Sequence, residues 1–251
     1  MDPVRTYKAL LFDLCNTLVV FESRRYPVLW LDGEAIMTTA GLLHRVLAKH
    51  HPVDLEDFAR TFLDVSQRLG ERKEADHREI STARRMAETL EALGIAPQPD
   101  LVETLVETHM AAVTGALVFN PAHRPLLERL SQAYALGVVS NFDHTPSALG
   151  VLEREALGTY FRTVVISEAV GWRKPHPRIF REALDALGVA PQDALFIGDS
   201  PEADVAGAAG VGMDTAWLNP QGQPLPLDLP APTYLLEDLG DLAALLGWNR
   251  P

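Results

Sequence analysis

The chain has a single cysteine among its 251 residues. One cysteine cannot form an intramolecular disulfide, and it cannot supply the paired thiolates of the usual structural zinc sites. Such cysteine usage is typical of proteins from a reducing compartment. The opening stretch MDPVRTYKALLFDL also lacks a separate apolar segment followed by a small-residue cleavage site. We therefore expect a cytoplasmic protein.

Long apolar runs and an excess of positive charge are also missing. No stretch approaches the ~20 uninterrupted apolar residues of a membrane-spanning helix, so no membrane partner is expected. The formal charge is −12, with 22 lysines and arginines against 34 aspartates and glutamates. Nucleic-acid affinity comes largely from cationic side chains that neutralise phosphates. A nucleic-acid partner is therefore not expected, and the oligomeric state is not readable from the sequence.

The sequence does contain short apolar runs that alternate with helical segments. The runs are apolar on both faces, as in buried parallel strands: Tyr7–Phe12, Leu136–Val139, Thr163–Ile166, Ala194–Ile197 and Asp214–Leu218. The segments with helical spacing between them are Pro125–Ala135, Pro177–Leu187 and Glu202–Ala209. This alternation predicts an α/β fold, a Rossmann-like open parallel sheet with right-handed crossovers.

Residues 21–118 break this alternation. Their apolar positions recur at three- and four-residue spacing, and no strand-like run interrupts them. We predict a helical cap domain over residues 21–118, inserted into an α/β core made of residues 1–20 and 119–251. Near the end of the core, the proline-rich residues 219–232 are expected to form a loop before a short strand near Tyr234 and a terminal helix from about Leu236.

Polar side chains stand at or just beyond the ends of the predicted strands. They are Asp13, Ser140, Asn141, Lys174, Asp199 and Asp204. Taken singly, each has a structural explanation as a turn residue, a helix cap or a solvated lysine. Ligands of open α/β sheets, however, bind beyond the carboxyl ends of the strands. Carboxylates, a hydroxyl and an ammonium at one edge therefore predict a site for Mg²⁺ and a phosphate group.

The segments FDLCNTL, VVSN, KPHP and IGDSPEAD resemble, in this order, the four motifs of the haloacid dehalogenase superfamily. The inserted segment is similar to the α-helical cap of its subfamily I, so the resemblance covers essentially the whole chain. It implies that Asp13 attacks the substrate as a nucleophile and that Lys174 offsets negative charge. It also implies that Ser140 and the neighbouring main-chain amides, including that of Asn141, hold the phosphoryl oxygens.

The resemblance also implies a ligand set for magnesium. Mg²⁺ would lie between the Asp13 carboxylate, the main-chain carbonyl of Cys15 and Asp199, with Asp204 bound directly or through water. Cys15 is the departure from the family pattern, because the phosphatases carry an aspartate there that protonates the leaving alkoxide and activates water. A thiol with a pKa of about 8.5 is a poor substitute. We expect metal binding to persist while acid–base assistance is lost.

Three functions remain open. The preferred one is a Mg²⁺-dependent phosphatase for a small phosphorylated metabolite, weakened by Cys15. Haloacid dehalogenases resemble the chain in VVSN and also lack the second aspartate, since a halide leaves without a proton or a metal. The intact GDSPEAD motif counts against them, because its carboxylates need a cation for balance. The third is a binding or regulatory protein that keeps the fold and the metal site.

Phosphonate hydrolases resemble the chain less, because they need a lysine in the cap. The cap lysines Lys49 and Lys73 are each expected to be solvated helix residues. Selectivity for the substrate should come from cap side chains, and the polar or aromatic candidates are Arg24, Arg25, Trp30, His77, Arg78, Arg84 and Arg85. His144, just after the second motif, either approaches the cap or caps the helix that follows it.

Overall fold

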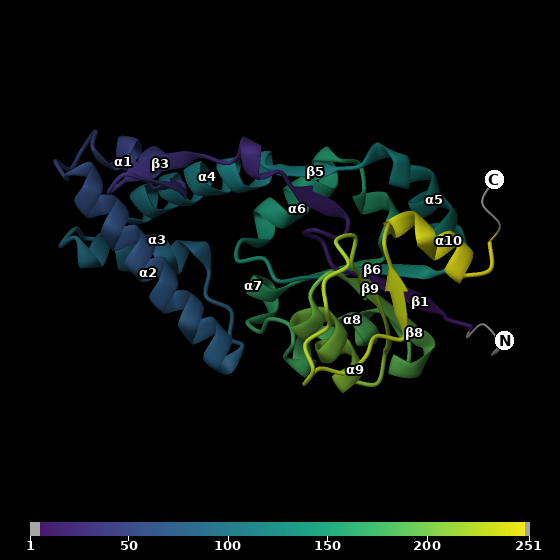
Figure 1. Cartoon of the computed structure of the whole chain (residues 1–251). Coiled ribbons are helices and arrows are strands. Elements are labelled where there is room, and N and C mark those ends of the chain that lie inside the picture. Colours follow the sequence, from purple (N-terminus) through teal and green to yellow (C-terminus); the bar gives the residue numbers. More distant parts are fainter. Residues whose placement is uncertain (1–5, 249–251) are drawn as a thin grey trace. The chain divides into compact units, whose positions relative to one another are not determined.

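The computed structural model describes residues 6–248, which fold into two compact units (Figure 1). The second unit comprises Phe21–Val118 and Asp143–Val151, and the other described residues form the first unit. The strand and helix pattern of the sequence assigns residues 143–151 to the α/β core. In the structure they group with the inserted segment instead.

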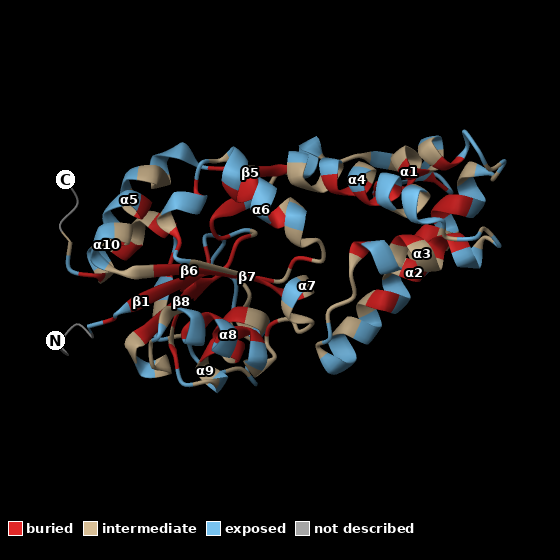
Figure 2. Ribbon diagram, turned by 180° about the vertical axis from the view of Figure 1, so that it is seen from behind, coloured by how far each residue is buried: buried red, intermediate tan, exposed pale blue. Residues whose placement is uncertain are grey.

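The first unit is built on a parallel sheet that, within residues 6–248, has six strands in the order β10-β9-β8-β1-β6-β7. The strands are β1 (Ala9–Phe12), β6 (Ala135–Ser140), β7 (Thr163–Ile166), β8 (Ala194–Gly198), β9 (Asp214–Leu218) and β10 (Tyr234–Leu236). Their side chains are largely buried (Figure 2). A parallel sheet covered on both faces needs apolar residues at successive positions, and the predicted α/β fold is confirmed.

Helices cover both faces of this sheet. Those of the first unit are α5 (Arg124–Ala133), α7 (Ser167–Val170), α8 (Pro177–Leu187), α9 (Gly207–Gly210) and α10 (Leu242–Leu245), whereas most of α6 (Thr145–Arg154) belongs to the second unit. In both views, α8 and α9 lie on one face, with α5 and α10 on the other (Figures 1 and 2). As predicted, α8 starts at Pro177 and ends before Gly188, which adopts a left-handed conformation with φ 65°. Within residues 6–248, no helix has the length and apolar character that crossing a membrane requires.

The terminal helix starts later than predicted. The chain leaves β10 at Leu236, makes a 3₁₀ turn over Leu239–Asp241, and enters α10 only at Leu242. The Asp238 side chain accepts a hydrogen bond from the Gly240 amide, and Asp241 bonds back to the Asp238 amide. This reciprocal capping places the start of the helical turns after Asp238. The remaining 3₁₀ turns are Ser23–Arg25, Pro121–His123, Gly158–Tyr160 and Pro191–Asp193.

The second unit contains the predicted helices. They are α1 (Ala40–Leu47), α2 (Leu55–Asp76), α3 (Thr82–Ala92) and α4 (Pro99–Gly115). Asp54 caps α2 by accepting bonds from the amides of Glu56 and Asp57, and Ser81 caps α3 by accepting one from Arg84. Apolar side chains of these helices are buried, and they include Leu43, Phe58, Phe62, Val65, Met86 and Leu90.

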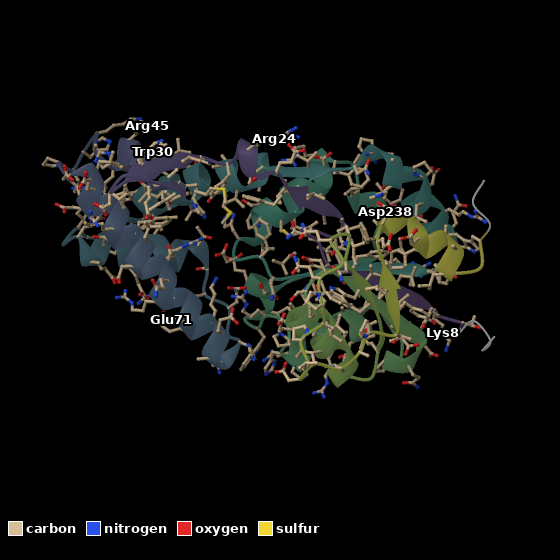
Figure 3. All side chains as sticks on the ribbon, in the orientation of Figure 1. Lys8, Arg24, Trp30, Arg45, Glu71 and Asp238 are labelled. Atoms are coloured by element: carbon tan, nitrogen blue, oxygen red, sulfur yellow. The ribbon has the colours of Figure 1, made fainter. Side chains whose placement is uncertain are left out.

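The prediction that no strand interrupts residues 21–118 is wrong. An antiparallel hairpin pairs β3 (Val28–Leu31) with β4 (Glu34–Met37). Asp32 and Gly33 connect the strands, both with positive φ (53° and 81°), as a tight hairpin turn requires. Trp30 is 72% exposed on this hairpin (Figure 3).

Two further short strands mark the ends of the insertion. β2 (Val19–Phe21) pairs with β5 (Leu117–Phe119) in a separate two-stranded sheet. The Glu22 amide continues this contact by donating to the Ala116 carbonyl at 2.8 Å. The chain therefore enters and leaves the inserted segment at adjacent points.

Candidate active site

The strand order places the candidate site at the middle of the sheet. From β1 the chain visits β6 and β7 on one side and then crosses to β8 on the other side of β1. Ligands of open α/β sheets bind where the strand order reverses in this way, which in this sheet is at the carboxyl ends of β1 and β8. Asp13 follows β1 and Asp199 follows β8, while Ser140 ends β6. The Asp13 amide donates to the Ile197 carbonyl at 2.9 Å, which ties the two strand ends together.

A buried lysine links two of the carboxylates. Lys174 Nζ lies 2.5 Å from Asp13 Oδ1 and 2.6 Å from Asp204 Oδ1, and the lysine side chain is 2% exposed. Burial by itself would lower the pKa of Lys174, but the charges of Asp13 and Asp204 raise it above its ordinary value. The ammonium is therefore charged at neutral pH.

Asp204 reaches this lysine because of the turn that carries it. Residues Pro201–Ala206 form a π-helical turn, and the Ser200 hydroxyl caps it by accepting a bond from the Ala203 amide at 3.1 Å. Asp204 Oδ2 in turn accepts a bond from the Ser200 amide at 2.9 Å. A Cβ atom on Gly198 would overlap the Asp204 carboxylate. Gly198 thus leaves room for the Asp204 carboxylate, and Ser200 holds that carboxylate against Lys174.

The side chain of Asn141 makes a contact that the sequence did not predict. Its side-chain amide donates to the Lys174 carbonyl at 2.9 Å and accepts from the Lys174 amide at 2.7 Å. Both ends of the Asn141 side chain are therefore used to hold the backbone of the lysine. This reciprocal contact was not foreseen from the sequence, where Asn141 was grouped with Ser140 as a contact for the phosphoryl oxygens.

Three carboxylates lie close enough to share a cation. Ligand atoms of Asp13, Asp199 and Asp204 are all within 4.8 Å of one another. Burial raises the pKa of Asp13 to about 7, with Lys174 opposing and Asp204 adding to the rise. Burial and the charge of Asp204 likewise raise the pKa of Asp199 to about 6. A bound cation would favour the ionised form of these carboxylates. Their oxygen atoms are the ligands that the hard cation Mg²⁺ prefers.

The turn after β1 carries the cysteine. Cys15 forms an isolated bridge with Val19, and the Asn16 amide donates to the Val19 carbonyl at 2.6 Å. Burial and the neighbouring Asp13 raise the pKa of Cys15 to about 12. The side chain is therefore a neutral thiol at physiological pH.

Two hydroxyls near the strand ends are buried without a hydrogen-bond partner among residues 6–248. They are Ser140 Oγ and Thr17 Oγ1, and the two residues are 1% and 3% exposed. Burying a hydroxyl without a hydrogen bond costs free energy. A ligand oxygen that bonded these two hydroxyls would remove that cost. Ser140 was expected in this position. Thr17 was missed, although its place four residues after Asp13 in the same turn was a usable signal.

The polar side chains of the second unit divide into two groups. As expected, Lys49 is exposed. The exposed candidates for substrate selection are Arg24, Arg25, Trp30, Arg78 and Arg84. The prediction for Lys73 is wrong. Its side chain is only 13% exposed and lies 2.7 Å from Glu79 and 3.3 Å from Asp143. Arg85 is likewise drawn in, with Nη2 3.2 Å from Asp143.

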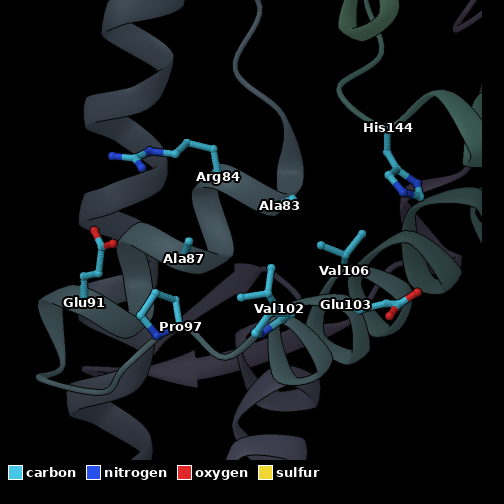
Figure 4. A pocket seen from close by; sticks show the side chains of 10 residues that line it. Ala83, Arg84, Ala87, Glu91, Pro97, Val102, Glu103, Val106 and His144 are labelled. Atoms are coloured by element: carbon cyan, nitrogen blue, oxygen red, sulfur yellow. The ribbon is translucent and has the colours of Figure 1, made fainter.

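His144 lines a cavity of about 660 Å³ that lies within the second unit. Ala87 of α3 and Val102 and Val106 of α4 form much of its apolar wall (Figure 4). His144 Nδ1 also lies 2.8 Å from the Ser147 hydroxyl, inside the first turn of α6. The His144 side chain therefore contacts the first turn of α6 and also forms part of the cavity wall.

Comparison with known proteins identifies the family of the chain. A model of the haloacid dehalogenase-like hydrolases matches residues 7–212. The chain belongs to this family of hydrolases, which confirms the resemblance of the four motifs.

Individual relatives carry two kinds of name. The chain is 31% identical over 216 residues to a glyceraldehyde 3-phosphate phosphatase of Methanopyrus kandleri, covering 83% of this chain and 82% of that one. It is 34% identical over 139 residues to the protein of the same name from Pyrococcus furiosus, covering 55% of each. The chain thus spans about half the length of the Pyrococcus relatives that it matches. A solved 2-haloacid dehalogenase from Pseudomonas syringae superposes with a TM-score of 0.74 at 25% identity, covering 96% of this chain and 99% of that one.

Proposed function

We propose that this hydrolase is a phosphatase that acts on a small phosphorylated metabolite and forms an aspartyl-phosphate at Asp13. The observation that carries the proposal is the buried ammonium of Lys174, 2.5 Å from Asp13 and 2.6 Å from Asp204. A nucleophilic carboxylate and a phosphate group repel each other, and a buried cation at this point offsets both charges. The phosphatase names of two relatives support the same reaction.

In the proposed reaction, an Asp13 carboxylate oxygen attacks phosphorus while the bond between phosphorus and the ester oxygen breaks. The unpartnered Ser140 hydroxyl and the neighbouring main-chain amides would hold the phosphoryl oxygens. Water then hydrolyses the acyl phosphate and regenerates the Asp13 carboxylate. Cys15 supplies a thiol where the phosphatases that the chain resembles carry a carboxylate. The leaving group therefore departs without a strong proton donor, which favours esters of acidic alcohols.

The donor set fits a magnesium ion. Asp13, Asp199 and the main-chain carbonyl of Cys15 would hold it, and Mg²⁺ often keeps several waters beside one or two carboxylates. Asp204 would contribute through water, because its two oxygens already accept bonds from Lys174 and Ser200. When bound, Mg²⁺ would offset the negative charge of the carboxylates and of the phosphate group.

The test is phosphate release from a panel of small phosphomonoesters, with Mg²⁺ and with a chelator. We expect release that requires Mg²⁺ and is abolished by Asp13→Asn, because an amide cannot attack phosphorus. Asp64→Asn is the matched control, since its carboxylate is 77% exposed on α2. Undiminished turnover by a folded Asp13→Asn protein would exclude covalent catalysis through this residue.

The alternative with a specific observation in its favour is a dehalogenase. With Cys15 at this position the chain lacks the proton-donating aspartate of the phosphatases, and a halide leaving group does not need such a donor. A structural relative also carries the dehalogenase name. Chloride release from 2-chloropropionate without Mg²⁺ identifies this reaction. A protein that releases neither phosphate nor chloride, yet is stabilised by Mg²⁺ in a way that Asp199→Asn removes, is a binding protein instead.

A further inference from the structure

A cluster of charged side chains separate from the Lys174 site lies within the second unit, and Asp143 is its centre. Asp143 Oδ1 accepts a bond from the Thr82 hydroxyl at 2.8 Å. Its Oδ2 atom lies 3.2 Å from Arg85 Nη2 and 3.3 Å from Lys73 Nζ. The Asp143 carbonyl also accepts a bond from the Thr82 amide at 2.9 Å. Helices α2 and α3 thus hold one residue by its side chain and its backbone.

The charges of this cluster balance. Lys73 also lies 2.7 Å from Glu79, whose side chain is 2% exposed, so two cations face two carboxylates. Burial alone would raise the pKa of Asp143, but the charges of Arg85 and Lys73 lower it below its ordinary value. The Asp143 carboxylate is therefore ionised, and its cations keep it so. Removing one member of such a partly buried group leaves a partner uncompensated.

The same cluster extends to the other helices of the second unit. Arg85 Nη2 lies 3.1 Å from His109 Nε2 on α4. His109 Nδ1 lies 2.7 Å from the hydroxyl of Thr39, which immediately precedes α1. Because a guanidinium only donates, Nε2 must accept, and the imidazole proton therefore lies on Nδ1 and points to Thr39. Asp143 is in this way connected to each of the helices α1 to α4.

Asp143 is close in the sequence to residues of the candidate active site. Asp143 ends a four-residue segment, 140–143, that begins with Ser140. Asn141 holds the backbone of Lys174 by two hydrogen bonds. The Phe142 amide donates to Ser167 Oγ at 3.0 Å, and the same hydroxyl lies 3.2 Å from the Phe142 carbonyl. Residues 141 and 142 are thus fixed within the first unit, whereas Asp143 is fixed within the second.

We propose that Asp143 is a positioning residue, which fixes segment 140–143 from its far end and so sets the placement of the Ser140 hydroxyl and, through Asn141, of Lys174. The kinetic part of this inference rests on the proposed phosphatase function. A displacement of about 1 Å in such groups costs on the order of 10²-fold in rate. The ionised, compensated carboxylate at position 143 is therefore part of what keeps the phosphate-binding groups in place.

The test compares Asp143→Asn with Glu79→Gln. Each replaces one carboxylate of the same cluster, which is 21% exposed in Asp143 and 2% exposed in Glu79, by an amide of similar size, but only Asp143 belongs to segment 140–143. Both variants should melt at lower temperature than the parent. For phosphomonoester hydrolysis with Mg²⁺, Asp143→Asn should lower kcat by about 10- to 100-fold with a smaller change in KM, whereas Glu79→Gln should leave kcat nearly unchanged. An equal loss of kcat in Glu79→Gln would overturn the inference.

Hydrogen exchange supplies a readout that needs no turnover. The amides of residues 141–143, and that of Lys174, which donates to Asn141, should exchange faster in Asp143→Asn but not in Glu79→Gln. Unchanged exchange in a folded Asp143→Asn protein would refute the positioning role whatever the enzyme does. If the parent releases no phosphate, the proposed function fails while this measurement still decides the inference. Should Asp143→Asn not fold, Thr82→Ala removes the 2.8 Å bond to Asp143 and the 3.2 Å bond that the Thr82 hydroxyl accepts from Arg85 Nη2. It leaves all the charges of the cluster in place and is expected to give the same pattern, weaker.

Discussion

Replacing Lys174 by methionine tests the electrostatic core of the site. The substitution keeps most of the buried side-chain volume but removes the ammonium that lies 2.5 Å from Asp13 and 2.6 Å from Asp204. Two buried carboxylates then face each other without a cation. Breaking a buried ion pair by removing one partner costs about 3–5 kcal/mol.

The loss should lie near the lower end of that range. The pKa of Asp13 is already raised to about 7 with Lys174 present, so without the lysine one carboxylate takes up a proton and escapes part of the repulsion. We expect Lys174→Met to lower the free energy of unfolding by about 3 kcal/mol. For a chain of this size that corresponds to a fall of roughly 6–12 °C in melting temperature.

Urea unfolding, followed by circular dichroism with a chelator present, measures this loss. The matched control is Lys8→Met. Lys8 Nζ lies 2.7 Å from Asp193, a similar separation, but the two side chains are 69% and 28% exposed, and exposed pairs contribute about 0–1 kcal/mol. If Lys174→Met destabilises the protein no more than Lys8→Met does, the buried ammonium does not compensate the carboxylates and the electrostatic argument fails.

Three further outcomes are expected. Cys15→Asp should raise kcat for an alkyl phosphate by up to ~10²–10⁴-fold, with a smaller gain for p-nitrophenyl phosphate, in initial-rate assays with Mg²⁺. Burial and the charge of Arg85 lower the pKa of His109 to about 3. Its contribution to stability is therefore complete above pH ~6.5 and falls as the pH drops toward 3, by at most about 1.4 kcal/mol per pH unit. Gly198→Ala should cost about 1–3 kcal/mol in urea unfolding, because the added methyl group overlaps the Asp204 carboxylate.

Each of these outcomes has its own control. A folded Cys15→Asp protein with no gain on the alkyl ester contradicts the missing-acid explanation. His109→Gln should flatten the acid side of the stability profile, and an unchanged slope would mean that another group titrates there. Gly70→Ala, on α2 with nothing within 4 Å of the added Cβ, should stabilise the protein by about 0.5–1 kcal/mol. A loss in both glycine variants would point to backbone effects instead of the clash with Asp204.

The α/β unit was the part that the sequence predicted best. Thr163–Ile166 and Asp214–Leu218 have the predicted bounds, and so does the helix Pro177–Leu187. Strands buried on both faces are apolar at successive positions, and a local reading detects this. Once the strands are known, parallel pairing brings their carboxyl ends together, so the neighbourhood of Asp13 and Asp199 follows from topology. The catalytic and metal-binding roles of these residues remain predictions.

The features that were missed depend on partners distant in the sequence. Lys73 looks like a solvated helix residue until Asp143, 70 residues later, is placed beside it. The contact between Asn141 and the Lys174 backbone likewise spans 33 residues. The hairpin β3–β4 is different, because its Asp32-Gly33 turn was readable. Its apolar residues were absorbed into the helical pattern that surrounds them.

The pairing of β2 with β5 brings the two ends of the inserted segment together. Because the chain enters and leaves it at adjacent points, recombination there can exchange residues 21–118 as a block without moving the strands of the parallel sheet. The strand-end carboxylates would pass through such an exchange unaltered. Asp143 would not, since its carboxylate depends on Lys73 and Arg85 inside the block. An inserted segment from another protein must therefore supply cations for Asp143, or Asp143 must be replaced at the same time. The residue at position 143 should co-vary with the inserted segment and not with the sheet.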